Sequence, residues 1–175
     1  MFLQKNNTNK TSYTIYQKIA HFSRDKIFYT KYNIPDTIDG RFDVMVLVTV
    51  IIIYRLSKIK TVGLDLSQKI FDLIFKDLDY SLRELGAGDV SVTKNMRKFI
   101  SSYMGRQKVY IEAFKKNNLS ALNLIIENNV YRSIDIEKDL IFSLSKNILK
   151  IVEIIDLIEN KKIVNGNFDF PKNIL

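Results

Sequence analysis

The feature that most constrains this sequence is a nearly uninterrupted apolar run. The segment RFDVMVLVTVIIIYRL covers residues 41–56, and in its apolar part, 44–54, only Thr49 is polar. About 11 residues are too few for a membrane-spanning helix, which needs about 20. We therefore expect a buried core element. Its β-branched residues leave a strand open, whereas its length and charged ends favour a central helix.

Composition excludes several kinds of chemistry. The chain has 175 residues, a usual length for one domain. It has no cysteine, which excludes disulfides, thiolate metal sites and cysteine nucleophiles. The single histidine, His21, excludes a His-pair metal site within the chain. No nucleophile-elbow motif accompanies it, so we expect His21 to be a surface or half-buried residue rather than a catalytic one.

Helical periodicity recurs along most of the chain. Apolar residues repeat at near-helical spacing in 13–29, 65–85, 90–116, 120–126 and 135–160. These patterns predict an all-α fold, a single compact bundle of about six helices. We expect residues 1–12 to be a mobile polar tail and 13–170 to form a single helical domain. The segment NGNFDFPKNIL at the end is predicted to be a loop.

Turn and cap residues predict where the helices begin and end. Thr37 or Asp39 is expected to cap the central helix, whereas Ser67 and Ser120 are expected to cap later ones. Gly86 stands where a left-handed C-cap is expected.

A glycine also lies inside the helical pattern of residues 90–116. Gly105 costs about 1 kcal/mol against alanine in a helix interior. A close helix crossing or a bend would account for it.

Three carboxylates and a guanidinium cluster within eight residues before the apolar run. They are Asp36, Asp39, Arg41 and Asp43. One hypothesis is an enzyme that uses this cluster for metal binding or acid–base chemistry. The spacing lacks the EF-hand pattern and its terminal glutamate. Turn and cap chemistry with an internal Asp–Arg pair is the favoured interpretation.

A second cluster contains Gly86, Gly88, Asp89 and Lys94. Glycines before a helix, with a lysine in its first turns, are one way to bind phosphate. No Walker pattern is present. A sharp turn between two helices, in which glycine supplies a positive φ, is the favoured interpretation.

Basic residues alternate with aromatic residues along 90–116, and the chain has a net charge of +8. The stripe contains Lys94, Arg97, Lys98, Tyr103, Arg106, Lys108 and Tyr110. The tyrosines belong to the apolar face, so only the cations are expected to face outward. This pattern predicts a positive partner-binding surface, and no motif supports specific DNA recognition. If Arg106 is exposed, Arg106→Glu is expected to weaken partner binding with little effect on folding.

Several motifs together resemble one protein family. NIPDTIDGRFDVMVL, IFDLIFKDLDYSLRELGAGDVSVTKNMRKF and YMGRQKVYIEAF occur in the order and spacing of the ubiquinol–cytochrome c chaperone family. ALNLIIENNVYRS and NFDFP resemble its downstream motifs. The likeness covers roughly residues 13–170.

The resemblance implies a helical protein without catalysis or a cofactor. Mitochondrial members assist the synthesis and assembly of cytochrome b, the membrane subunit of complex III. They act with a small partner subunit at the ribosome exit region. The motif residues expected to mark the fold or its binding face are Asp36, Asp39, Arg41, Gly86, Gly88, Asp89, Lys94, Gly105, Arg106, Tyr131 and Arg132.

Two departures from the family pattern bear on these expectations. Val48 stands where the family commonly has a histidine, either for binding or for core packing. The start, MFLQKNNTNKTSY, resembles neither a signal peptide nor a transit peptide. We therefore expect a bacterial, cytoplasmic protein, with peripheral contact at the inner membrane. The alternative function is a general ribosome- or RNA-binding helical module.

Overall fold

Helix α3 (Ile38–Ser57) lies at the centre of the fold. Of its 20 residues, 15 are buried, and it contacts α1, α4, α5, α6 and α7. A helix that is apolar on every side is stable only when neighbours cover every side. Burial therefore outweighs the modest helix propensity of its β-branched residues, and the prediction of a helix rather than a strand is confirmed. Val48 is fully buried and serves core packing.

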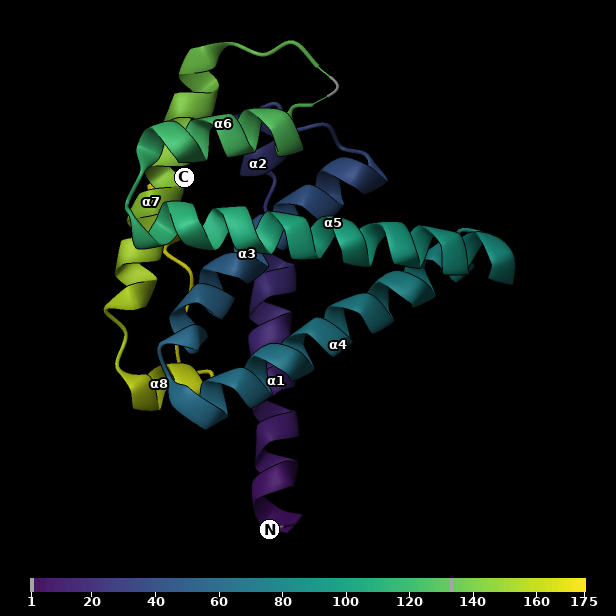
Figure 1. The fold of residues 1–175 in the computed structure, drawn as a ribbon, viewed down its shortest axis with the longest axis vertical. Helices are drawn as coiled ribbons and strands as arrows, with labels where there is room; N and C mark the ends of the chain where they lie inside the picture. Colours follow the sequence, from purple (N-terminus) through teal and green to yellow (C-terminus); the bar gives the residue numbers. More distant parts are fainter. Residues whose placement is uncertain (1, 133) are drawn as a thin grey trace.

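The computed structural model describes residues 2–132 and 134–175, with side chains from residue 8 onward, and these residues form no β-strand. Figure 1 shows the other helices arranged around α3. They are α1 (Phe2–Ser23), α2 (Ile27–Thr30), α4 (Lys60–Glu84), α5 (Asp89–Lys115), α6 (Leu119–Val130), α7 (Lys138–Asp156), α8 (Asn160–Val164) and a terminal 3-10 turn, η1 (Lys172–Ile174). The all-α prediction is confirmed. The six predicted helices correspond to the six that have 12 residues or more in the described part.

The first helix begins earlier than the sequence predicted. Residues 2–12 belong to α1, and the side chains of Thr11 and Ser12 are buried. Residues 2–12 are therefore helical, whereas the mobility that the sequence predicts for them stays a prediction, and Met1 lies outside the described residues. Contacts with α4 cover the end of this polar segment, where Thr11 and Ser12 are buried.

One of the predicted helix caps is confirmed, and two others are wrong. The Thr37 side chain accepts a hydrogen bond from the Gly40 amide, as expected for the N-cap of α3. Ser67 is not a cap, because α4 begins at Lys60 and the Ser67 hydroxyl donates to the Gly63 carbonyl inside the helix. Asn118, not Ser120, caps α6.

A glycine explains why α4 follows α3 so closely. A Cβ atom on Gly63 would lie 2.1 Å from the Leu56 carbonyl oxygen. Only glycine leaves room for the end of α3 at this distance. The helix therefore begins before its amphipathic pattern becomes visible in the sequence.

The C-terminal segment packs onto α1 and contains short helices. The last long helix, α7, ends at Asp156 rather than near residue 160, and α8 follows it. The rings of Phe22 and Phe170 stack with centroids 4.4 Å apart. The loop prediction is thus wrong for η1, and the buried phenylalanines make this segment part of the core.

None of the described helices combines the length and the apolar character needed to cross a bilayer.

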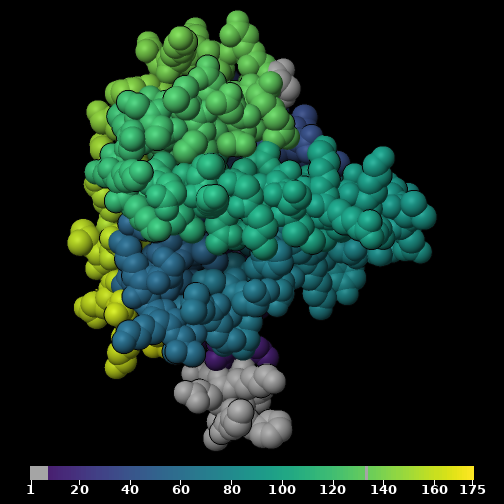
Figure 2. Space-filling model, viewed as in Figure 1, coloured from purple at the N-terminus to yellow at the C-terminus, as the bar shows by residue number. Residues whose placement is uncertain are grey.

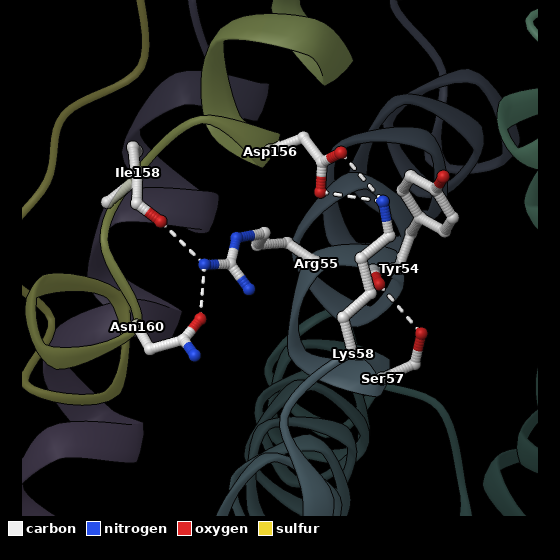
Figure 3. Close-up of polar contacts among 7 residues, drawn as sticks. All are labelled: Tyr54, Arg55, Ser57, Lys58, Asp156, Ile158 and Asn160. Carbon is white, nitrogen blue, oxygen red and sulfur yellow. Dashed lines mark hydrogen bonds and ion pairs between the residues drawn. The ribbon is translucent and has the colours of Figure 1, made fainter.

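Polar contacts fasten the C-terminal end of α3 to α7 and α8 (Figure 3). The buried Arg55 guanidinium donates through Nη2 to the Ile158 carbonyl at 2.5 Å and to Asn160 Oδ1 at 2.6 Å. Nearby, Lys58 Nζ lies 2.7 Å from Asp156 Oδ2 at the surface. A buried guanidinium needs such acceptors, because a charge removed from water is otherwise very costly.

We predict that Arg55→Met lowers the free energy of unfolding by about 2–3 kcal/mol, since it removes two charge-assisted hydrogen bonds that join α3 to the Ile158 carbonyl and to Asn160. Lys58→Met is the matched control and should cost less than about 1 kcal/mol, because its ion pair is exposed to solvent. Urea unfolding measures both values. Equal losses in the two variants would contradict the anchoring role of Arg55.

Candidate protein-binding site

A groove opens between the start of α3 and the C-terminal half of α4. It encloses about 400 Å³, and α1 and α2 close its other side. We call it the α3–α4 groove. Its floor is apolar and consists of Phe42, Met45, Ile74, Leu78 and Leu82. Two apolar side chains on its rim stay in solvent, because Ile38 is 50% exposed and Leu85 is 69% exposed.

The charged groups on the rim of the groove are paired with each other. Arg41 donates to both carboxylate oxygens of Asp36, at 2.5 and 3.1 Å, and this holds the pKa of Asp36 below its usual value. Arg24 Nη2 lies 3.7 Å from Asp77 Oδ2. The predicted Asp–Arg pair is confirmed. Two cations and two anions leave the rim without net charge, which favours an uncharged apolar ligand.

A buried ion cluster lies beside the groove, where α3 meets α5. Asp43 is 2% exposed and Arg106 is 8% exposed. Arg106 Nη2 lies 2.9 Å from Asp43 Oδ1, and Arg132 Nη1 lies 3.2 Å from Asp43 Oδ2. Arg132 also reaches Asp39 at 3.6 Å. The cluster ties α3, α5 and the end of α6 together.

Electrostatic attraction, more than aligned hydrogen bonding, joins Asp43 to Arg106. Within the described part of the chain, neither Asp43 Oδ1 nor Arg106 Nε has a hydrogen-bond partner. Burial raises the pKa of the Asp43 carboxyl to about 6, although the Arg106 and Arg132 guanidiniums oppose the shift. Asp43 is therefore a buried carboxyl held between two arginines that connect α3 to α5 and to the end of α6.

The turn between α4 and α5 forms the outer end of a helical hairpin. Gly86 has a φ of +84°, and its amide donates to the Arg83 carbonyl. The Ala87 amide donates to the Leu82 carbonyl, which completes a Schellman C-cap. The predicted left-handed C-cap at Gly86 is confirmed. Gly88 has an ordinary φ of −70° as the N-cap residue of α5.

Comparison with known proteins identifies the family. Residues 30–170 match the sequence model of a protein family whose description is ubiquinol-cytochrome C chaperone. The chain belongs to this family. A solved structure, the crystal structure of the Cbp3 homolog from Brucella abortus, is similar with a TM-score of 0.85 and 28% sequence identity. The match covers 97% of this chain and 93% of that chain. No curated protein sequence matches. The family and the structural match support a chaperone or assembly role.

The structure divides the acidic cluster of this chaperone-family chain. Asp36 and Arg41 are on the groove rim, whereas Asp43 is buried with Arg106. In the part of the chain that is described, no three His, Asp or Glu side chains converge as metal ligands would. The hypothesis of one catalytic carboxylate cluster required these groups to share a pocket, and they do not.

The basic stripe is also divided. Lys94, Arg97, Lys98 and Lys108 are exposed, and Tyr103 and Tyr110 are buried, as predicted. Arg106 is buried, so the expectation that it faces a partner is wrong, and Arg106→Glu would disrupt the core.

Other motif residues have structural positions. The buried Tyr131 donates through its hydroxyl to the Tyr32 carbonyl at 2.6 Å. A Cβ atom on Gly105 would meet no atom within 4 Å, so the predicted close helix crossing is absent within the described residues. Lys94 and Asp89 lie at the outer end of the hairpin, where Asp89 pairs with Arg83.

Sequence reasoning missed most of the groove. Met45, Ile74 and Leu78 looked like ordinary core residues, because each follows the apolar periodicity of its own helix. They differ from other core residues only because α3 and α4 bring them together around one groove. No local sequence pattern shows which residues of two helices will meet in this way.

Gly86→Ser should lower the free energy of unfolding by about 1–2 kcal/mol, because a residue with a Cβ is strained at this φ. Gly88→Ser is the matched control and should leave stability unchanged or slightly raised, since serine is a preferred N-cap. Thermal unfolding compares the two. Equal stability would show that the turn relaxes around the new side chain.

The buried carboxyl of Asp43 predicts a pH dependence. Between pH about 4 and 6, folded Asp43 keeps a proton that the unfolded chain releases, so its contribution to the free energy of unfolding falls as pH rises. For Asp43→Asn, the free energy of unfolding relative to the parent should rise by up to about 3 kcal/mol over this range.

Urea unfolding of both proteins at several pH values tests this sign. A relative stability that falls as pH rises would show that the arginines, rather than burial, dominate the pKa of Asp43.

Proposed function

We propose that this protein is a non-enzymatic assembly factor that binds newly made cytochrome b and promotes assembly of the ubiquinol–cytochrome c reductase, complex III. The observation that carries the proposal is the α3–α4 groove, whose apolar floor is open to solvent within a charge-balanced rim. Membership of the chaperone family supports the same role.

The groove suits apolar side chains of a client better than a soluble metabolite. A volume of about 400 Å³ is small for a whole helix but accommodates a few side chains that project from one helix face. A newly made membrane subunit exposes such side chains before it is assembled. Met45 lies in the groove floor, and methionine adapts to ligands of different shape.

The side chains around the groove do not form a catalytic set. The carboxylates of Asp36 and Asp77 are paired with arginines, and His21 is not among the lining residues. Tyr29 donates its hydroxyl to the Ser23 carbonyl. These groups shape the rim and hold it in place, which is the task of a binding site.

The alternative, a general RNA- or ribosome-binding module, has weaker support. RNA-binding surfaces combine cations with exposed aromatic rings that stack on bases. Here Tyr103 and Tyr110 are buried, and Arg106 is occupied by Asp43. Binding at the ribosome exit region and a small partner subunit remain expectations from the family resemblance.

We predict that Ile38→Glu reduces the capture of cytochrome b by about tenfold or more, because it places a charge where an apolar side chain of the client would be buried. Folding should be preserved, since Ile38 is half exposed and a glutamate suits the first turn of α3. Crosslinking and purification of the tagged protein from its native cells, with mass spectrometry, measures the captured client.

Val62→Glu is the matched control. Val62 is 49% exposed, lies in the first turn of α4 and does not line the groove. It should capture cytochrome b and support complex III as the parent does. Undiminished capture by Ile38→Glu would exclude the groove, and normal complex III after deletion of the gene would exclude the assembly role.

A further inference from the structure

We propose that the outer face of α5 binds the surface of a membrane through its anionic lipid headgroups. The α4–α5 hairpin extends beyond the rest of the molecule (Figure 1), and in the space-filling view it forms a projecting arm (Figure 2). Because this arm projects, its outer face can lie along a flat bilayer.

One line of exposed residues runs along α5. They are Val90, Lys94, Arg97, Ser101, Met104 and Lys108, which we call the α5 outer stripe. Their spacing alternates between four and three residues, so they share one face of the helix. The stripe contains three cations and no acidic residue.

The cations of the stripe are free to bind an external anion. Lys94, Arg97 and Lys108 make no ion pair with any residue in the described part of the chain. Nearby acidic residues are mostly neutralised, because Arg83 pairs with both Asp79 and Asp89. Glu84 is the exposed carboxylate that remains close to the turn.

The stripe also contains apolar side chains that nothing in the protein covers. Val90 is 86% exposed, and Met104 is about half exposed. Cations beside exposed aliphatic groups are typical of helices that lie in the interface of an anionic bilayer. The cations bind headgroups, and the aliphatic groups leave water. A nucleic acid would use the cations but would gain little from valine and methionine.

This proposal is independent of the client groove. Val90 and the cations of the stripe do not line the α3–α4 groove, and a lipid-binding assay needs no client. Failure of membrane binding would leave the assembly proposal intact, and failure of client capture would leave the membrane contact intact.

The test uses the full chain and vesicles of phosphatidylcholine with or without phosphatidylglycerol. We expect sedimentation with the anionic vesicles only, weakening as salt is added. Each lysine or arginine near an anionic surface contributes about fivefold to affinity. K94Q/R97Q/K108Q should therefore reduce binding on the order of 100-fold.

The matched control is K138Q/K146Q/K150Q, which removes three exposed charges from α7 and should bind almost as the parent does. Equal losses in the two triple variants would show that net charge alone drives binding, and would overturn the assignment to α5.

Insertion is measured separately by fluorescence, because the chain has no tryptophan. Emission of a Val90→Trp variant should shift to the blue on addition of anionic vesicles, whereas a Leu157→Trp variant should not shift. Leu157 is 85% exposed and lies at the end of α7. Absence of vesicle binding, a shift in both variants, or binding of an oligoribonucleotide but not of vesicles would overturn the proposal.

Discussion

From Val46 to Leu56, helix α3 has no face that is left in water, and the other helices are arranged to cover it. Side chains such as Val44, Leu47, Ile51 and Ile52 point in different directions around its axis, and all are fully buried. One neighbouring helix cannot cover all of this surface. Five helices therefore pack against α3, namely α1, α4, α5, α6 and α7. This burial is the main source of stability, because each large apolar side chain contributes about 1.5–3 kcal/mol.

Burial of α3 also removes from water a charged side chain near each of its two ends. Asp43 near the start and Arg55 near the end are drawn into the core with the apolar residues between them. Each acquires partners from distant segments: Arg106 and Arg132 for Asp43, and the Ile158 carbonyl with Asn160 for Arg55. Asp43, a member of the acidic cluster predicted from the sequence, and Arg55 therefore fix helices in place.

The surfaces available for binding lie outside this core. The α3–α4 groove forms where the start of α3 turns away from α4, so that apolar side chains from both helices face one hollow. The α5 outer stripe exists because α4 and α5 extend past the helices that cover α3 (Figure 1). Under the two proposals made above, the apolar groove would contact the side chains of the client and the basic arm would contact the bilayer.

The sequence by itself determined the helical class, the central place of residues 41–56, the cap at Thr37 and the turn at Gly86, because each depends on local periodicity or backbone geometry. The motifs of the family, in their order along the chain, could likewise be recognised from the sequence. The start of α4 at Lys60 depends on a local contact, the close approach of Gly63 to the Leu56 carbonyl. Tertiary structure alone decided that Arg106 is buried and that Met45 and Leu78 share a groove. Each of these depends on contacts between segments far apart in the chain, and a periodic pattern shows only which face of a helix is apolar, not which neighbour covers it or leaves it open.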